Sequence, residues 1–174
     1  MKKFVVMSLL AVCATMGMAQ CAEKQAPRAA EPVAQNEAPA EENLAPDFTL
    51  VSLDGSKLAL SSLRGKYVVI DFWGSWCYWC MKGVPQMKEY YAKYKDKLEI
   101  LGVNYGDDVN KWKDTVREND MPWKHVRMED DAVAKLYEVQ GFPTKVVIDP
   151  QGHLLKTVVG ESEEFYQYID ELMK

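Results

Sequence analysis

The chain has few cysteines and histidines, and they do not form a scaffold pattern. Four cysteines and two histidines occur among 174 residues. Cys77 and Cys80 make one C-x-x-C motif with no second motif to match it, and His125 and His153 lie far apart in the sequence. A structural zinc site needs four ligands, and a disulfide framework needs several cysteine pairs. We therefore expect no metal site and no disulfide framework.

The chain also lacks an excess of basic charge. It carries 21 lysines and arginines against 26 aspartates and glutamates, which gives a net charge of −5 without any basic block or stripe. Nucleic acids and anionic membrane surfaces attract basic patches. We therefore expect no nucleic-acid partner, and no membrane contact except through a lipid at the N-terminus.

The first apolar run is too short to span a bilayer as a stable helix. A positively charged start precedes an apolar stretch over residues 4–14, and Gly17 and Ala19 then occupy the −3 and −1 places of a cleavage site. This pattern predicts an export signal over residues 1–19. A retained N-terminal anchor is the alternative.

Cys21 follows this segment almost directly. A cysteine at such a place resembles the lipid-attachment cysteine of bacterial lipoproteins, although Gln20 stands where that pattern has a small residue. Lipidation of Cys21 and a free exported chain are both open alternatives. Residues 20–44 are rich in Ala, Pro, Glu and Gln and have no apolar periodicity, so they predict a disordered linker or tether ahead of a domain at residues 45–174.

The C-x-x-C motif has the surroundings of a reactive dithiol. The apolar run over residues 67–72 predicts a buried strand, and a helical stretch begins at Cys77. The amides and dipole of a helix start favour a thiolate there. Cys80 lies one turn further on and can close a disulfide with Cys77. A purely structural disulfide would close too small a loop to stabilise much, so a dithiol–disulfide cycle is the favoured function.

Strand and helix signals alternate along the rest of the domain. Asp54 and Gly55 lie between two short apolar runs and predict a hairpin. Further strands are expected at residues 67–72, 98–103, 126–128, 144–148 and 154–159, and helices at residues 77–95, 107–119, 131–137 and after Ser162. We expect Gly83 and Pro85 to interrupt the first helix. Alternating strands and helices, with one late antiparallel hairpin, predict an α/β fold with a mixed central sheet flanked by helices.

Several motifs occur together in a fixed order. They are FWGSWC at residues 72–77, Pro85 in the helix that follows, VQGFPT at residues 139–144, IDPQG at residues 148–152, and APDF at residues 45–48 ahead of the hairpin. This set resembles the thioredoxin-like superfamily, and more closely its extracytoplasmic TlpA-like branch, over residues 45–174. The resemblance implies a thioredoxin-like fold with an N-terminal β-hairpin and an inserted helix, a cis proline at Pro143, and no cofactor.

Two positions depart from the TlpA-like pattern. Trp79 stands where that branch usually has proline before the second cysteine, and Gly83 stands where it usually has a glutamate beside the dithiol. The resemblance to thioredoxin itself then leaves Asp71, six residues before Cys77, as a buried acid and the candidate proton acceptor for Cys80. An ordinary strand-end acid that faces solvent is the alternative for Asp71.

The remaining candidate residues surround the motif. Cys77 is expected to be the exposed nucleophile, and Cys80 the more buried cysteine that resolves the mixed disulfide. Substrate-binding residues are expected at Trp76, Tyr78, Trp79, Phe142 and Pro143. We expect Trp73 at the rim of the site, with a core position as the alternative. Trp112 and Trp123 are expected to pack rather than to act, and His125 and His153 to lie at the surface.

The favoured function is that of an exported, periplasmic protein thiol-disulfide oxidoreductase. It would reduce disulfides of extracytoplasmic protein partners and receive its electrons from a membrane electron donor. A thiol peroxidase is one alternative, but it wants a threonine or serine where this chain has Gly74. A redox-inactive binding module on a thioredoxin scaffold is the other, and such modules usually lack one of the two cysteines.

Overall fold

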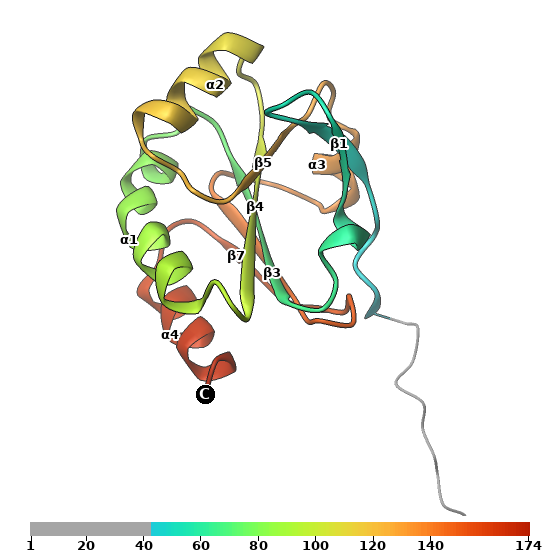
Figure 1. Ribbon diagram of the computed structural model, residues 1–174, viewed down its shortest axis with the longest axis vertical. Helices are drawn as coiled ribbons and strands as arrows, with labels where there is room; N and C mark the ends of the chain where they lie inside the picture. The colour runs from blue at the N-terminus through green and yellow to red at the C-terminus, as the bar shows by residue number, and fades with distance from the viewer. Residues whose placement is uncertain (1–42) are drawn as a thin grey trace, which may run out of the picture. The chain divides into compact units, whose positions relative to one another are not determined.

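The computed structural model of the protein describes residues 43–174. The expected export signal, Cys21 and nearly all of the expected linker lie outside the described residues. The described chain is built on one seven-stranded sheet (Figure 1). The strands are β1 (Thr49–Ser52), β2 (Lys57–Ala59), β3 (Tyr67–Trp73), β4 (Leu98–Asn104), β5 (Lys124–Arg127), β6 (Thr144–Ile148) and β7 (Leu154–Val159). The helices are α1 (Tyr78–Tyr94), α2 (Val109–Glu118), α3 (Ala132–Leu136) and α4 (Glu163–Leu172), with a short 3-10 helix η2 (Leu60–Leu63).

The strands lie in the order β2-β1-β5-β4-β3-β6-β7. β3 pairs in parallel with β4, and β4 with β5, as strands joined by crossover helices do. β6 pairs antiparallel with both β3 and β7, and β1 pairs antiparallel with β2 in the hairpin expected around Asp54 and Gly55. The predicted mixed sheet is therefore confirmed.

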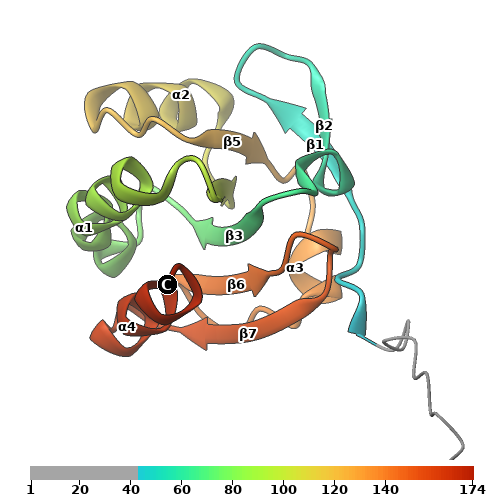
Figure 2. The same cartoon turned by 60° about the horizontal axis from the view of Figure 1, so that its bottom comes forward.

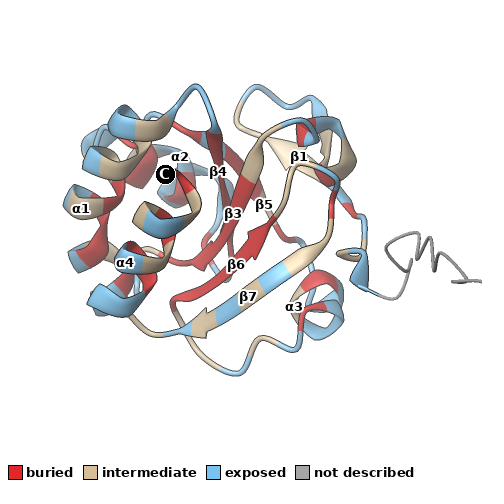
Figure 3. Ribbon diagram, turned by 90° about the horizontal axis from the view of Figure 1, so that it is seen from below, coloured by how far each residue is buried: buried red, intermediate tan, exposed pale blue. Residues whose placement is uncertain are grey.

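Helices cover both faces of the sheet. α1, α2 and α4 pack on one face, and α3 and η2 pack on the other (Figure 2). Because side chains alternate along a strand, Val69 and Trp73 of β3 face α1, whereas Ile70 and Phe72 face α3. The same alternation directs Asp71 toward α1. Figure 3 shows that the buried residues follow the central strands and the inner sides of the helices.

The helix starts follow capping residues in the sequence. Oδ1 of Asp108 accepts hydrogen bonds from the amides of Asn110 and Lys111 at the start of α2. Oγ of Ser162 accepts one from the amide of Phe165 at the start of α4. These bonds satisfy amides that have no partner within the helix. Within residues 43–174, no helix is both long and apolar enough to cross a membrane.

Gly83 and Pro85 do not interrupt α1, contrary to expectation. The helix runs as one element over Tyr78–Tyr94. A proline inside a helix removes one backbone hydrogen bond and crowds the preceding turn. The buried stripe of Cys80, Gly83, Val84 and Met87 packs against the rest of the core on both sides of Pro85. This packing outweighs the local cost of the proline.

Trp73 and His125, expected at the site rim and at the surface, lie in the core. Trp73 is 1% exposed and His125 is 2% exposed, and their ring centroids lie 5.8 Å apart. Gly102 makes room for them, because a Cβ there would lie 2.6 Å from Nδ1 of His125. Burial lowers the pKa of His125 to about 4. The core alternative therefore holds for Trp73, and the surface prediction for His125 was wrong. Trp112 and Trp123 are buried in the same core, as expected.

The start of the described chain contacts the turn between β6 and β7. Leu44 forms an isolated β-bridge with His153, and the amide of Ala45 donates to the carbonyl of Gly152 over 2.9 Å. The side chain of His153 is partly exposed, and its Nδ1 lies 2.9 Å from Oδ2 of Asp149. The first described residues therefore pair with this turn.

Candidate active site

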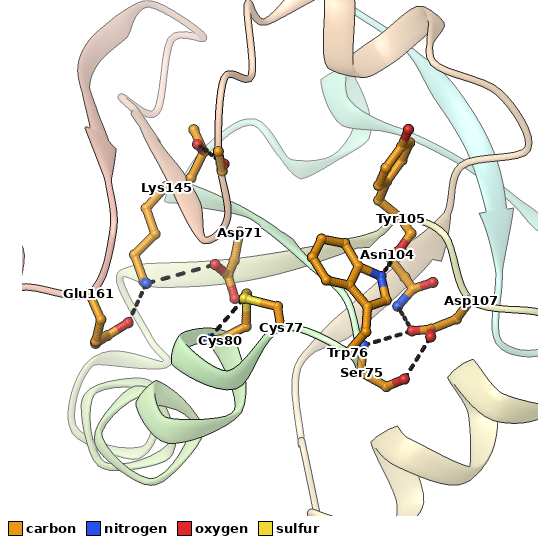
Figure 4. Close-up of a disulfide and its surroundings, with 12 residues drawn as sticks. Asp71, Ser75, Trp76, Cys77, Cys80, Asn104, Tyr105, Asp107, Lys145 and Glu161 are labelled. Atoms are coloured by element: carbon orange, nitrogen blue, oxygen red, sulfur yellow. Dashed lines mark hydrogen bonds and ion pairs between the residues drawn. A yellow bond between two sulfur atoms is a disulfide. The ribbon is translucent and has the colours of Figure 1, made fainter.

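Cys77 and Cys80 form a disulfide at the point where β3 gives way to α1 (Figure 4). Cys77 is the N-cap residue of α1, and the amide of Cys80 donates to Sγ of Cys77 over 3.2 Å. Amides and the dipole at a helix start stabilise negative charge. Once the disulfide is reduced, the backbone therefore favours a thiolate on Cys77.

The expected difference in exposure between the two cysteines is absent in this disulfide state. Cys77 is 6% exposed and Cys80 is 7% exposed. Two bonded sulfurs shield each other, so exposure does not separate the nucleophile from the resolving cysteine. Their backbone positions do, because Cys77 caps the helix and Cys80 lies inside its first turn.

Asp71 is buried, and the solvent-facing alternative is excluded. Figure 4 shows its carboxyl group pointing toward the disulfide. Its register partner on β6 is Lys145, whose Nζ lies 3.9 Å from Oδ1 of Asp71 and donates to Oε2 of Glu161 over 2.6 Å. Burial raises the pKa of Asp71, while the charge of Lys145 opposes this rise and the charge of Glu161 adds to it. Asp71 therefore holds its proton more tightly than an exposed aspartate does.

Lys145 and Glu161 were not predicted from the sequence. Lys145 gave a signal, since it is the one charged residue of a strand whose next three residues are apolar, and a buried lysine needs a partner. Glu161 gave none, because it lies in the short connection between β7 and α4 and resembles any surface acid. Only the three-dimensional arrangement brings the two residues to Asp71.

The connection between β4 and α2 fixes the loop that leads to the dithiol. Asp107 accepts hydrogen bonds from the amide and hydroxyl of Ser75, over 2.8 and 2.6 Å, and from Nδ2 of Asn104 over 2.6 Å. Nε1 of Trp76 donates to the carbonyl of Tyr105 over 3.0 Å. Figure 4 shows these contacts beside the disulfide. Asp107 was not among the site residues expected from the sequence.

An aromatic rim surrounds the dithiol. Trp76, Tyr78 and Trp79 are each more than half exposed. The ring of Phe142 meets Trp76 edge-on at 5.2 Å and stacks on Tyr105 at 5.3 Å. Large exposed aromatic side chains that gather at one place mark an interaction surface. Of the expected substrate-binding residues, the structure thus brings Trp76 and Phe142 into direct contact.

Pro143 follows Phe142 through a cis peptide bond, as the resemblance to the thioredoxin-like superfamily implied. Pro143 is buried, and its carbonyl accepts a hydrogen bond from the amide of Gly160 over 2.7 Å. Its backbone oxygen is therefore already engaged within the chain. The partly buried ring of Phe142 joins the aromatic rim.

Comparisons with known proteins agree with this geometry. The thioredoxin-like family model matches residues 65–154, just over half of the chain. Thiol-disulfide oxidoreductase ResA of Bacillus cereus is 32% identical over 131 residues, which cover 74% of this chain and 76% of ResA. The solved thioredoxin domain of a thiol-disulfide oxidoreductase from Bacteroides vulgatus has a TM-score of 0.69 at 29% identity, over 75% of this chain and 96% of that domain. The exposed lipoprotein thioredoxin of Streptococcus pneumoniae has a TM-score of 0.64 at 28% identity, over 72% and 99% of the two chains.

Sequence, fold and redox motif therefore agree on one family. The similarity to ResA extends over most of the domain, well beyond the C-x-x-C motif alone. The match to solved oxidoreductases covers nearly their whole length. The chain accordingly belongs to the thioredoxin-like family, within its TlpA-like branch, and is a thiol-disulfide oxidoreductase.

Proposed function

We propose that the protein is an exported reductant that opens disulfides in extracytoplasmic protein partners. The observation that carries this proposal is the burial of Asp71 behind a disulfide whose first cysteine, Cys77, caps α1. That arrangement gives the two cysteines different chemistry. One is prepared to attack, and the other has a proton acceptor beside it.

The first step is an attack by Cys77. In the reduced protein its thiolate attacks one sulfur of the partner's disulfide. A bond forms between Sγ of Cys77 and that sulfur, and the partner's other sulfur leaves as a thiolate. The start of α1 stabilises the attacking charge.

The second step is the resolution of this mixed disulfide by Cys80. The proton of Cys80 passes to the carboxylate of Asp71, and the freed sulfur attacks Sγ of Cys77. The partner's remaining sulfur leaves as a thiolate, so the partner has gained two electrons and the protein holds the Cys77–Cys80 disulfide. Because burial raises the pKa of Asp71 toward that of a thiol, it is a better proton acceptor than an exposed aspartate would be.

The aromatic rim is the proposed docking surface for the partner. Trp76, Tyr78 and Trp79 expose their rings, and the partly buried ring of Phe142 packs against Trp76, so that an extended polypeptide can bury apolar side chains here. Pro143 directly precedes Thr144, which pairs with Phe72 of β3, so it joins this loop to the central sheet. Rings around a reactive sulfur let the protein bind varied partners without a deep pocket.

Export is proposed from the N-terminal sequence. Cleavage after residue 19 would leave a chain that starts at Gln20, and lipid attachment would leave one that starts at Cys21 with added acyl mass. The similarity to an exposed lipoprotein thioredoxin supports the second form. Intact-mass measurement of the exported protein distinguishes them. A membrane electron donor would then return the Cys77–Cys80 disulfide to the dithiol.

Insulin reduction tests the proposed function. The wild-type protein should accelerate insulin precipitation in the presence of dithiothreitol, whereas Cys77→Ser should not. The Cys77–Cys80 reduction potential should lie nearer that of thioredoxin, about −270 mV, than that of a strong oxidant such as DsbA, about −120 mV. A potential at the oxidising end would reverse the proposed direction of electron flow. Rapid consumption of peroxide would favour the peroxidase alternative, for which Gly74 provides no hydroxyl.

A further inference from the structure

The ion pair between Lys145 and Glu161 has no role in the steps above. Over residues 43–174, Lys145 is the only buried lysine or arginine, and its side chain is 2% exposed. A buried ammonium is costly unless it is paired and hydrogen-bonded. Here Nζ lies 2.6 Å from Oε2 of Glu161 and 3.9 Å from Oδ1 of Asp71. One buried cation therefore faces two carboxyl groups, as Figure 4 shows.

Glu161 reaches this position because Gly83 leaves it open. A Cβ on Gly83 would lie 2.4 Å from Oε2 of Glu161. Gly83 also stands three residues after Cys80, where the TlpA-like pattern usually has its acid. The carboxylate that α1 lacks is thus supplied by the connection between β7 and α4.

The surroundings of Asp71 leave few other charges to consider. The titratable groups that face it are Cys77 and Cys80 at the start of α1, Lys145 from β6, Glu161 from the β7–α4 connection and Tyr166 from α4. On β4 its register partner is Gly102, which has no side chain. The hydroxyl of Tyr166 donates to Oε1 of Glu161 and holds that carboxylate toward Lys145.

We propose that Lys145 and Glu161 are positioning residues for the resolving step, in which one buried cation shared between two carboxylates lets Asp71 both take and return the Cys80 proton. This inference rests on the proposed function. The charge of Lys145 favours the carboxylate form of Asp71, so that it can accept the proton. Glu161 engages the same cation and favours the protonated form, so that Asp71 can give the proton back when the disulfide is reduced again.

Removing the charge of Lys145 and removing the charge of Glu161 should shift the pKa of Asp71 in opposite directions. The readout is the pKa of Asp71, measured from the carbon-13 NMR signal of its carboxyl group in the oxidised protein. Lys145→Met should raise this pKa by about 1–3 units, because an attracting charge is lost. Glu161→Gln should lower it by about one unit, because a repelling charge is lost and Lys145 is freed.

The same order should appear in the kinetics of the resolving step. In single turnovers with an aromatic disulfide, the second thiol release should reach half of its maximal rate at a higher pH in Lys145→Met and at a lower pH in Glu161→Gln. The first release, which depends on Cys77, should keep its wild-type profile. If the two residues only supported the fold, their substitutions would not shift the pH profile of this one step in opposite directions.

Matched controls come from an ion pair on the outer side of the same region. Nζ of Lys156 lies 2.8 Å from Oε1 of Glu164, and neither residue faces Asp71. Lys156→Met and Glu164→Gln make the same charge changes and should leave the pKa of Asp71 in place. Where Lys145→Met alone fails to fold, its combination with Glu161→Gln leaves neither member of the pair charged. In that double variant the pKa of Asp71 should still be higher than in the wild type, because Lys145 has a larger effect on it than Glu161 has.

Shifts in the same direction, or no shift in either single variant, would overturn the role of Lys145 and Glu161. The NMR titration needs no turnover, so it separates this inference from the proposed function. Opposite shifts in a protein that fails to reduce insulin would count against the reductase and support the coupling of Asp71 to the pair. If the protein reduces insulin but the pKa of Asp71 does not change in the variants, only the coupling of Asp71 to Lys145 and Glu161 is overturned.

Discussion

Replacing His125 by phenylalanine should remove much of the protein's loss of stability in mild acid. His125 is buried between two indole rings, with centroid distances of 5.8 Å to Trp73 and 5.7 Å to Trp123. Burial lowers its pKa from an ordinary 6.5 to about 4, and outweighs an interaction with the backbone of Met121 that would raise it. Phenylalanine keeps a ring in this position and removes the group that takes up a proton.

The size of the effect follows from proton binding by the two states. The unfolded chain protonates His125 near pH 6.5, whereas the folded chain does so only near pH 4. Between these values the unfolded state binds more protons, so the free energy of unfolding falls as the pH falls. At about 1.4 kcal/mol per pH unit, this interval removes about 3 kcal/mol from the wild-type protein.

Urea unfolding of both proteins at about pH 7 and about pH 4 measures this quantity. The larger ring of phenylalanine costs roughly 1–3 kcal/mol of packing strain, but it does so at both pH values and cancels in the comparison. Other titrating groups, Asp71 among them, are shared by the two proteins and cancel as well. Between about pH 7 and about pH 4, the free energy of unfolding should therefore fall by about 3 kcal/mol more in the wild-type protein than in His125→Phe. If the difference in free energy of unfolding between the two proteins is the same at both pH values, the reasoning from burial is refuted.

The dithiol and its supports give three further expectations. Cys80→Ser should accumulate a mixed disulfide with a protein substrate on non-reducing gels, and Cys77→Ser should not, since the attacking sulfur is then missing; the reverse pattern would exchange their roles. Asp71→Asn should slow the second thiol release at least about tenfold and leave the first nearly unchanged, whereas equal slowing of both would make Asp71 structural. Gly102→Ala should lower the free energy of unfolding by about 1–3 kcal/mol, because its Cβ would lie 2.6 Å from Nδ1 of His125; an unchanged urea midpoint would mean that the ring moves aside.

Elements with local signals could be predicted from the sequence. The strands at Thr144–Ile148 and Leu154–Val159 have their predicted bounds, because a turn with proline and glycine separates two apolar runs. Ser162 begins α4 as expected, since a hydroxyl at that place satisfies a free amide. Cys77 and Cys80 were found for the same reason, as their spacing alone brings them within bonding distance.

Contacts between distant segments could not be predicted in this way. Lys145 meets Asp71 only because β6 pairs antiparallel with β3 in one register. Glu161 joins them only where Gly83 leaves room. His125 is buried because β5 lies beside β4, where Gly102 has no side chain in the way. Each of these depends on a pairing that the residues' own neighbours in the sequence do not specify.

Ala45 enters the domain at the end that lies opposite the dithiol. Its amide bonds to Gly152 in the β6–β7 turn, beside the beginning of β3, whereas Cys77 follows the end of β3. The seven residues of β3 separate these two ends by about 20 Å. An attachment at the N-terminus would therefore join the domain far from Cys77 and would leave the aromatic rim uncovered.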